Sequence, residues 1–457
     1  MRATFENAES RYASSKAKLQ QAFLEARKAG REVRLGKRTS NLFRERDTSG
    51  AVTLDVSGFN TVISVDPDAR TADVGGMTPY DAVVAATLSH GLMPAVVPEL
   101  KSITVGGAVT GGGIESSSFR YGFVHESVRE MEILTPTGEV LECGPDNEQS
   151  DLFYGFANSY GTLGYALRLR IELAPVAPCV LLTHKRYANS EKYFRDMAET
   201  CEKERNNPEG AAFIDGTVFD EGEMYQTIGE WTQKTDAVSD YTFMRPYYRS
   251  IQIRETDCLK TKDYIWRWDT DWFWCARAFG MENPALRFLF GICGGLNSRT
   301  YWKLRNKYER SALARKFGPT RSLEWVIQDV EIPVDRAAGF QRFLQEKIGI
   351  HPFWICPAKA YHNSSLFPLY QTDPNILYIN FGFWGGVPAT EGKGYHNRLV
   401  ENKVAELGGK KSLYSASYFT EEDFWKHYNK PAYQALKERY DPDGFFPDLY
   451  GKCVLGR

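Results

Sequence analysis

Glycine residues gather in one stretch of the chain, and their spacing is the clearest indication of chemistry in the sequence. Residues Pro98 to Ser118 read PELKSITVGGAVTGGGIESSS. Where glycines replace larger residues, backbone amides can approach a bound group closely. The natural ligand of such amides is an anion, for example a pyrophosphate. The stretch predicts an anion-binding loop, and its alternative interpretation is a pair of tight turns in a β-region.

Two common phosphate-binding motifs do not fit the sequence. No G-x-G-x-x-G can be aligned with the stretch 98–118, and no helix of typical length is expected directly after it, which disfavours a Rossmann fold. Gly36 and Lys37 lack the earlier glycine of an ATPase-type loop, and Arg38 occupies the place of its Ser or Thr. A different arrangement for holding an anion is therefore expected.

Short strands and a few helices must position the glycine stretch. The predicted strands cover 52–56, 62–65, 72–74, 128–134, 140–143 and 166–173. Thr78-Pro79 predicts the start of a helix that ends at Gly91, and a second helix is expected from Asp151. Because strands and helices do not alternate strictly, the pattern is typical of an α+β fold.

The prolines near residues 175 to 178 mark a change in composition, which is typical of a domain boundary. We therefore expect an N-terminal helix at 1–30, a binding domain at 31–176, an α+β substrate domain at 177–420 and a C-terminal segment at 421–457.

Composition and charge exclude several classes of function. With 56 basic and 58 acidic residues, the net charge is −2, which gives no reason to expect nucleic acid. The eight cysteines have no C-x-x-C spacing, so neither a zinc site nor a disulfide framework is indicated. No stretch approaches ~20 uninterrupted apolar residues, and the first 31 residues lack the core of a signal peptide. We expect a cytoplasmic protein without a metal.

Aromatic residues are dense between Tyr264 and Phe279. Tyr264, Trp268 and Trp272 recur every four residues and would share one face of a helix. With charged residues between the rings, this helix would suit a peripheral contact with lipid headgroups at the inner face of a membrane. The alternative is that the rings fill the core of the substrate domain.

Several motifs spread over both halves of the chain resemble one family of flavoproteins. They are Pro98-Glu99-Leu100, Gly113-Ile114-Glu115-Ser116-Ser117-Ser118, Trp354-Ile355-Cys356-Pro357, Leu377-Tyr378-Ile379 and Glu422-Asp423-Phe424-Trp425. From about Arg34 to the C-terminus, the chain resembles the vanillyl-alcohol-oxidase class, and within it the Δ24-sterol reductase family and its bacterial methylene-fatty-acyl reductase relatives. The resemblance implies a two-subdomain FAD-binding domain and a substrate (cap) domain, with the C-terminal segment returning to the FAD-binding domain.

The resemblance also implies where FAD lies. The first loop would contain Arg38, Thr39, Ser40 and Asn41. The glycine stretch would contribute Pro98, Glu99, Thr104, Val105, Gly106, Gly107, Gly111, Gly112, Gly113, Ile114, Glu115, Ser116, Ser117 and Gly122. A turn at the adenine end would contain Gly161, Thr162, Leu163 and Gly164. Taken without the resemblance, the first loop is also typical of a solvated basic turn. The turn at 161–164 is also typical of a connection between a helix and a strand.

The mode of FAD attachment follows from the histidines. None of the seven lies in the first loop, where some members of the class attach flavin covalently. We therefore expect non-covalent FAD, although His90 and His125 are close enough in sequence to the flavin region to allow a covalent link.

In the resembling sterol reductases the reaction is reduction of a carbon–carbon double bond. An unactivated alkene accepts hydride poorly, so an acid must protonate one carbon. The candidate acids are Tyr378, Tyr414, Tyr418 and Glu115. Alternatively, the three tyrosines are core residues whose hydroxyls are hydrogen-bonded, and Glu115 only holds its loop in place. Trp354, Asn380 and Phe381 are candidate walls of the substrate pocket.

The resemblance offers two lipid substrates, a sterol side chain and a methylene-branched fatty acyl chain on a phospholipid. Since no N-terminal membrane anchor is expected, the acyl chain is preferred, and a partner lipid methyltransferase would make it. NADPH is a candidate electron donor. Two alternatives stay open: an FAD-dependent oxidase or dehydrogenase of an alcohol, sugar or hydroxy acid, and a lipid-binding protein without enzymatic activity.

Overall fold

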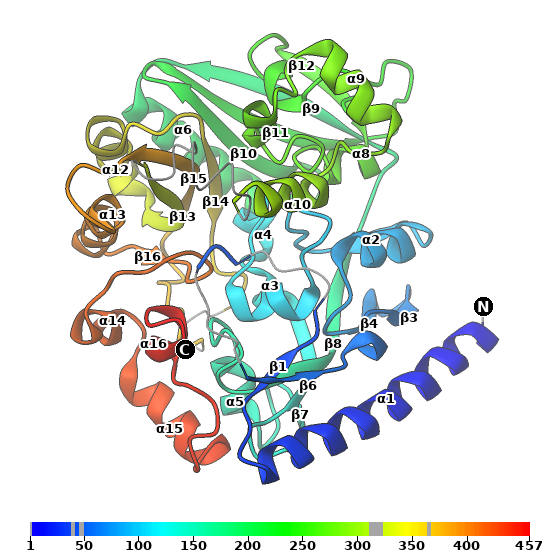
Figure 1. Cartoon of the computed structure of the whole chain (residues 1–457). Coiled ribbons are helices and arrows are strands. Elements are labelled where there is room, and N and C mark those ends of the chain that lie inside the picture. The colour runs from blue at the N-terminus through cyan, green and yellow to red at the C-terminus, as the bar shows by residue number, and fades with distance from the viewer. Residues whose placement is uncertain (1, 38–41, 45–49, 310–322, 363–366) are drawn as a thin grey trace.

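The computed structural model describes residues 2–37, 42–44, 50–309, 323–362 and 367–457. Two large β-sheets organise the chain, one in the lower half of Figure 1 and one in the upper half. Every strand pair in both large sheets is antiparallel, which agrees with the predicted α+β class.

The lower sheet has six strands in the order β3-β4-β8-β6-β7, with β5 also paired to β8. They are β3 (Val62–Asp66), β4 (Thr71–Gly75), β5 (Leu92–Pro94), β6 (Val128–Leu134), β7 (Val140–Cys143) and β8 (Tyr165–Pro175). In β8, buried Leu167, Leu169 and Ile171 alternate with arginines, and this period of two places one face in the core. A separate parallel pair joins β1 (Val33–Leu35) to β2 (Val52–Leu54).

Helices surround this sheet. They are α1 (Arg2–Lys28), α2 (Tyr80–Leu88), α3 (Val105–Gly111) and α5 (Ser150–Gly155), whereas α4 (Ser118–Tyr121) packs against β14 of the upper sheet. Helix α1 runs along the lower edge of the molecule in Figure 1. Its Phe23 ring is fully buried and contacts Phe445 and Phe446, with ring centroids 5.6 and 6.1 Å away.

The upper sheet has eight strands in the order β12-β9-β11-β10-β14-β15-β13-β16. They are β9 (Cys179–Tyr187), β10 (Ala211–Asp220), β11 (Glu223–Thr232), β12 (Thr256–Lys260), β13 (Leu323–Pro333), β14 (Phe353–Ala358), β15 (Tyr378–Pro388) and β16 (Lys410–Lys411). Helices α6 (Ser190–Arg205), α12 (Ala337–Phe343) and α13 (Tyr395–Glu406) cover one face through a buried cluster that includes Phe194, Phe340 and Val400. The opposite face is left to form a site.

The remaining helices are α7 (Tyr247–Ser250), α8 (Thr261–Ile265), α9 (Pro284–Ile292), α10 (Ser298–Glu309), α14 (Glu421–His427), α15 (Lys430–Tyr440) and α16 (Leu449–Cys453). The C-terminal helices lie beside the lower sheet in Figure 1. Tyr440 in α15 donates a hydrogen bond to Asp151 in α5 over 2.7 Å, which ties the last segment to the 31–176 region.

The aromatic stretch 264–279 differs from the expected lipid-facing helix. The stretch starts at the end of α8, continues in turns, in which Trp272 and Phe273 have positive φ angles of 47° and 58°, and ends in a short 3-10 helix at Cys275–Phe279. Tyr264 and Trp268 are each 1% exposed. The rings therefore fill the core, and the prediction that they contact lipid headgroups is wrong. Among the described residues, no helix is long and apolar enough to cross a membrane.

Candidate active site

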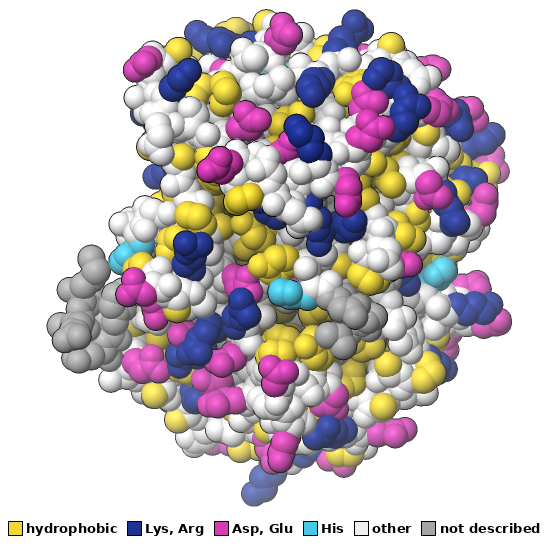
Figure 2. Space-filling view, turned by 180° about the vertical axis from the view of Figure 1, so that it is seen from behind, with side chains coloured by type: hydrophobic (Ala, Val, Ile, Leu, Met, Phe, Trp, Pro, Cys, Tyr) yellow, Lys and Arg dark blue, Asp and Glu magenta, His cyan; other side chains and the backbone are white. Residues whose placement is uncertain are grey.

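A cavity of about 1680 Å³ lies between the two sheets. Its walls include the glycine stretch and the β1 end from the lower half, and strands β13 to β15 from the upper half. From behind, hydrophobic side chains gather around the waist of the molecule, between its upper and lower parts (Figure 2). The volume exceeds the roughly 300–1,000 Å³ of a typical small-molecule pocket, so a cofactor and a substrate can share it.

Glycines bring the backbone of α3 close to both the sheet and the cavity. A Cβ atom on Gly106 would lie 2.7 Å from the carbonyl oxygen of Gly76, so only glycine allows the helix to pack here. Gly112 ends the helix with a φ of 69°, and a Cβ added there would meet no atom within 4 Å because the position opens on the cavity. Part of the predicted loop is thus a short helix with a left-handed end, and the alternative of a pair of tight turns does not describe it.

The cavity collects eleven of the 22 residues predicted to hold FAD. Those that line it are Pro98, Glu99, Thr104, Gly106, Gly107, Gly111, Gly112, Gly113, Ile114, Gly161 and Gly164. Arg38, Thr39, Ser40 and Asn41 lie outside the described residues, although the preceding Gly36 and Lys37 line the cavity. Glu99 is 4% exposed, and its Oε1 has no hydrogen-bond partner among the described residues. A cradle of glycines and a buried oxygen without a partner fit a nucleotide cofactor that supplies donors of its own.

The other predicted cofactor residues lie behind the cavity wall. Val105 and Leu163 are fully buried in the core, and the Thr162 hydroxyl donates to the Ser159 carbonyl. Gly122 has a φ of 65° and packs against the Glu126 carboxylate. Val105 differs from the glycines that follow it because helix α3 presents its glycines to the cavity and its valines to the core.

Replacing Gly112 by Val is expected to weaken FAD binding about tenfold or more, because a branched side chain would both strain a left-handed residue and enter the cavity. FAD titration followed by flavin fluorescence measures the change. Gly349→Val is the matched control: Gly349 also has a φ of 69° with open space around it, and it does not line the cavity. Equal FAD affinity in the two variants would contradict the assignment.

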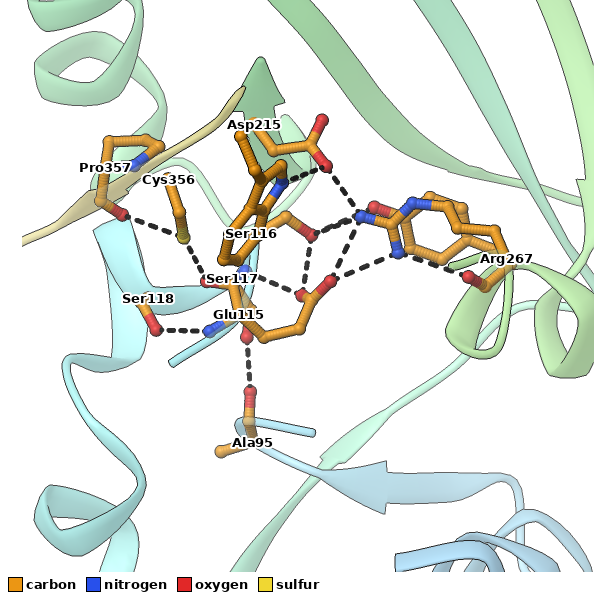
Figure 3. Close-up of polar contacts among 11 residues, drawn as sticks. Ala95, Glu115, Ser116, Ser117, Ser118, Asp215, Arg267, Cys356 and Pro357 are labelled. Carbon is orange, nitrogen blue, oxygen red and sulfur yellow. Dashed lines mark hydrogen bonds and ion pairs between the residues drawn. The ribbon is translucent and has the colours of Figure 1, made fainter. Parts of the chain in front are cut away.

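Glu115, Ser116 and Ser117 belong to a buried polar cluster that Figure 3 shows. Oε1 of Glu115 accepts hydrogen bonds from both terminal nitrogens of Arg267 over 3.1 Å, and Arg267 also donates to Asp215 over 2.8 Å. Ser116 Oγ donates to the other Glu115 oxygen, and Ser117 Oγ donates to the Ala95 carbonyl. Burial raises the pKa of Glu115, while the Arg267 charge acts in the opposite direction. This cluster holds the glycine stretch against β10, so Glu115 fastens its loop and does not line the cavity.

Two carboxyl groups enter the cavity from β13. Odd-numbered residues of this strand line it, namely Trp325, Ile327, Asp329 and Glu331. Asp329 is held by Tyr414, whose hydroxyl donates to Oδ2 over 2.6 Å, and by Asn380, whose amide donates to Oδ1 over 2.9 Å. The Tyr370 hydroxyl donates to Glu331.

Burial decides the charge of these two acids. It raises the pKa of Asp329 to about 6 and that of Glu331 to about 8. Hydrogen bonds from Tyr414 and Tyr370 oppose each shift without cancelling it. At neutral pH Glu331 therefore keeps its proton inside the cavity, which is the property a general acid needs.

Of the four predicted proton donors, the structure brings only Tyr414 to the cavity. The Tyr378 hydroxyl accepts a hydrogen bond from the Asp373 amide near the start of β15, and the Tyr418 ring lies beside Arg398. Among the predicted pocket residues, Trp354 lines the cavity, Asn380 holds Asp329, and Phe381 faces the helix-covered side of the sheet against Phe340. Successive residues of β15 point to opposite faces, which explains the difference between Asn380 and Phe381.

Sequence reasoning missed Asp329 and Glu331. The available signal was the spacing of two that these acids share with Trp325 and Ile327, which is the period of one face of a strand. Among the described residues no histidine lines the cavity, and His125 is buried between Phe123 and Phe367.

Comparison with known proteins assigns the lower domain. The family described as "FAD binding domain" matches residues 11–144. The chain is 26% identical to Delta(24)-sterol reductase of Homo sapiens over 339 residues, which cover 70% of this chain and 62% of that protein. It is 24% identical to Delta(24)-sterol reductase of Arabidopsis thaliana over 452 residues, 88% of this chain and 77% of that protein.

The match thus spans less than two thirds of the human protein, whereas the match to the plant protein covers 88% of this chain. The predicted resemblance is confirmed, and FAD is the cofactor that the matching domain implies. Residues 11–144 thus match an FAD-binding domain, and the chain is related, as an FAD-linked oxidoreductase, to the Δ24-sterol reductases at 24–26% identity.

Proposed function

We propose that this protein uses FAD to reduce a carbon–carbon double bond in a lipid. A methylene-branched fatty acyl chain, reduced to a methyl branch, is the preferred substrate, and a sterol side chain is the second. One observation carries the proposal: a single cavity joins the glycine cradle to an aromatic chamber that contains a protonated carboxyl group.

The chamber suits an apolar substrate. Its aromatic lining consists of Phe43, Phe156, Tyr160, Tyr165, Trp272, Phe273, Trp274, Phe279, Trp325, Trp354, Trp384, Tyr414, Phe445 and Phe446. Trp384 donates its ring N–H to the Tyr414 hydroxyl over 3.0 Å, so its polar edge is satisfied and its ring face remains apolar. The aromatic lining favours an apolar substrate over the small polar substrate of an alcohol or sugar oxidase, although charged side chains such as Arg277 and Arg305 also line the cavity.

The residues of β13 would manage the proton. FAD, when bound and reduced, supplies a hydride to one alkene carbon. The carboxyl proton of Glu331 passes to the other carbon, so that both new C–H bonds are accounted for. The carboxylate that remains is stabilised by the hydrogen bond from Tyr370 Oη and regains a proton from solvent. Asp329, which accepts a hydrogen bond from Tyr414, is a second acid on the same strand as Glu331.

FAD is proposed to bind without a covalent link, because no histidine among the described residues lines the cavity. NADPH is the proposed source of electrons, and a lipid methyltransferase that makes the methylene branch is the proposed partner.

The proposal is tested by anaerobic reduction of the FAD-loaded protein, followed by mixing with candidate substrates. Reoxidation of the flavin near ~450 nm by a methylene-branched phospholipid, with a saturated methyl branch found by mass spectrometry, is the expected result. Reoxidation by a Δ24-sterol alone selects the second substrate. Flavin reduction by an alcohol or sugar would favour an oxidase, and a protein that takes up no FAD would favour lipid binding without catalysis.

The pH dependence of turnover follows from Glu331. This acid must be protonated to act, and its pKa is raised to about 8, so kcat/KM should be level near neutral pH and fall above pH about 8. Tyr370→Phe removes a hydrogen bond that lowers this pKa, and the decline should move to higher pH. Flavin absorbance across the same range verifies that FAD stays bound. A level profile up to pH 10 would exclude Glu331 as the acid.

A further inference from the structure

Helix α9 turns its apolar side outward. Its four large exposed side chains are Leu286, Phe288, Leu289 and Ile292, which are 43%, 48%, 55% and 61% exposed. At 100° per residue these positions and Ala285 occupy one continuous arc of the helix. A surface helix of a globular protein normally places such an arc against the core.

A buried ion pair fixes this orientation. Arg287 is 2% exposed, and its two terminal nitrogens donate to the two carboxylate oxygens of Asp271 over 2.5 and 3.1 Å. Its Nε donates to the Phe243 carbonyl, and Asn283 caps the helix at its start. Rotating the apolar arc inward would separate a bidentate buried pair, which is strongly unfavourable. The outward face is thus built into the fold.

The same helix is attached to the wall of the cavity. Its Phe290 packs in a cluster with Trp272, Cys275 and Phe279, and these three residues line the cavity. Leu304 of α10, the next helix in the chain, also lines it. In Figure 1, α9 lies on the upper right of the molecule and α10 near its centre. The helix that carries the exposed apolar arc therefore packs against residues that form the cavity wall.

Exposed cations occur on the segments around α9. Arg245 follows the exposed Met244, Arg277 precedes the helix, and Lys303 and Lys307 lie on α10. The nearby Glu282 is neutralised by Arg249, with an N–O distance of 2.6 Å. An apolar helix face with exposed cations on the neighbouring segments suits binding at an anionic membrane interface.

We propose that the outer face of α9 docks this protein on an anionic lipid surface. The alternative partner is a second copy of the chain. However, the four side chains expose on the order of a few hundred Å², below the roughly 800 Å² per partner of a stable protein interface. The lipid surface is favoured by the cations as well. This proposal concerns binding alone, so it stands or fails separately from the reaction proposed above.

Flotation with vesicles of phosphatidylcholine and phosphatidylglycerol (3:1) tests the proposal on the FAD-loaded protein. We expect binding to these vesicles, with an affinity reduced about tenfold or more in Leu289→Ser/Ile292→Ser, since two of the four inserted side chains are lost. Leu24→Ser/Leu455→Ser, which removes two exposed leucines far from α9 in sequence, should bind like the wild type. Pure phosphatidylcholine vesicles and 0.5 M NaCl should each weaken binding.

Three outcomes would overturn the proposal. The wild type fails to bind anionic vesicles, both double variants lose binding equally, or sedimentation without lipid gives a dimer that only the α9 variant dissociates. The last outcome would assign the surface to a second copy. Retained FAD absorbance and an unchanged melting temperature in both variants verify that the fold is intact.

Discussion

Glu331→Gln is expected to lower kcat by about 10²- to 10⁴-fold while leaving FAD bound, which is the range for loss of a general acid. Glutamine keeps the shape of the side chain and can still accept a hydrogen bond from Tyr370, but its amide has no acidic proton to transfer. Single-turnover reoxidation of the reduced protein by the lipid measures the effect. The glycine cradle lies on the other half of the cavity, so flavin absorbance should be unchanged.

Two further variants show whether Glu331 acts alone. Glu142→Gln, an exposed glutamate on β7, is the matched control and should have wild-type rates. Asp329→Asn should have a smaller effect than Glu331→Gln if Asp329 only supports the site. A Glu331→Gln rate within about twofold of the wild type, together with a large loss in Asp329→Asn or Tyr414→Phe, would transfer the role to the second acid.

The other large effect is expected at Arg267. Arg267→Leu should destabilise the protein by about 3–5 kcal/mol, because Glu115 and Asp215 would be left buried without their cation. A substantial fall in melting temperature by calorimetry, with weaker FAD retention, is the expected result, since the cluster fastens the glycine stretch to β10. Arg267→Lys keeps the positive charge but cannot make the contact through two nitrogens, so its melting temperature should lie between those of the wild type and Arg267→Leu. A melting temperature unchanged in Arg267→Leu would refute this role.

Much of the lower domain could be predicted because its signals are local. Alternating apolar residues fix strands such as β8, and glycine spacing indicates a backbone that approaches a ligand. Helix α3 could not be predicted in this way, since its sequence VGGAVTG has poor helix formers. Tertiary packing decides its conformation, in particular the approach of Gly106 to the Gly76 carbonyl.

The upper domain was harder to predict because its buried charged residues pair with residues that are not their neighbours in sequence. Arg267 and Asp271 between tryptophans indicate a surface when only neighbours are considered. In the fold, they pair with Asp215 and Arg287, and this allows the whole stretch to be buried. The converse error applies to α9, whose run of apolar residues would suggest a core helix. No local pattern reveals which face of β13 carries its acids to a cavity.

The contact between Phe23 and Phe445 bears on how the protein is made. A ribosome produces residues 444–457 after all the other residues that line the cavity, and these include Phe445, Phe446, Lys452 and Arg457. The Phe23 ring of helix α1 therefore lacks its partners Phe445 and Phe446 until that segment has been made. Capture of the flavin in its complete chamber is consequently a late event that follows translation of this segment.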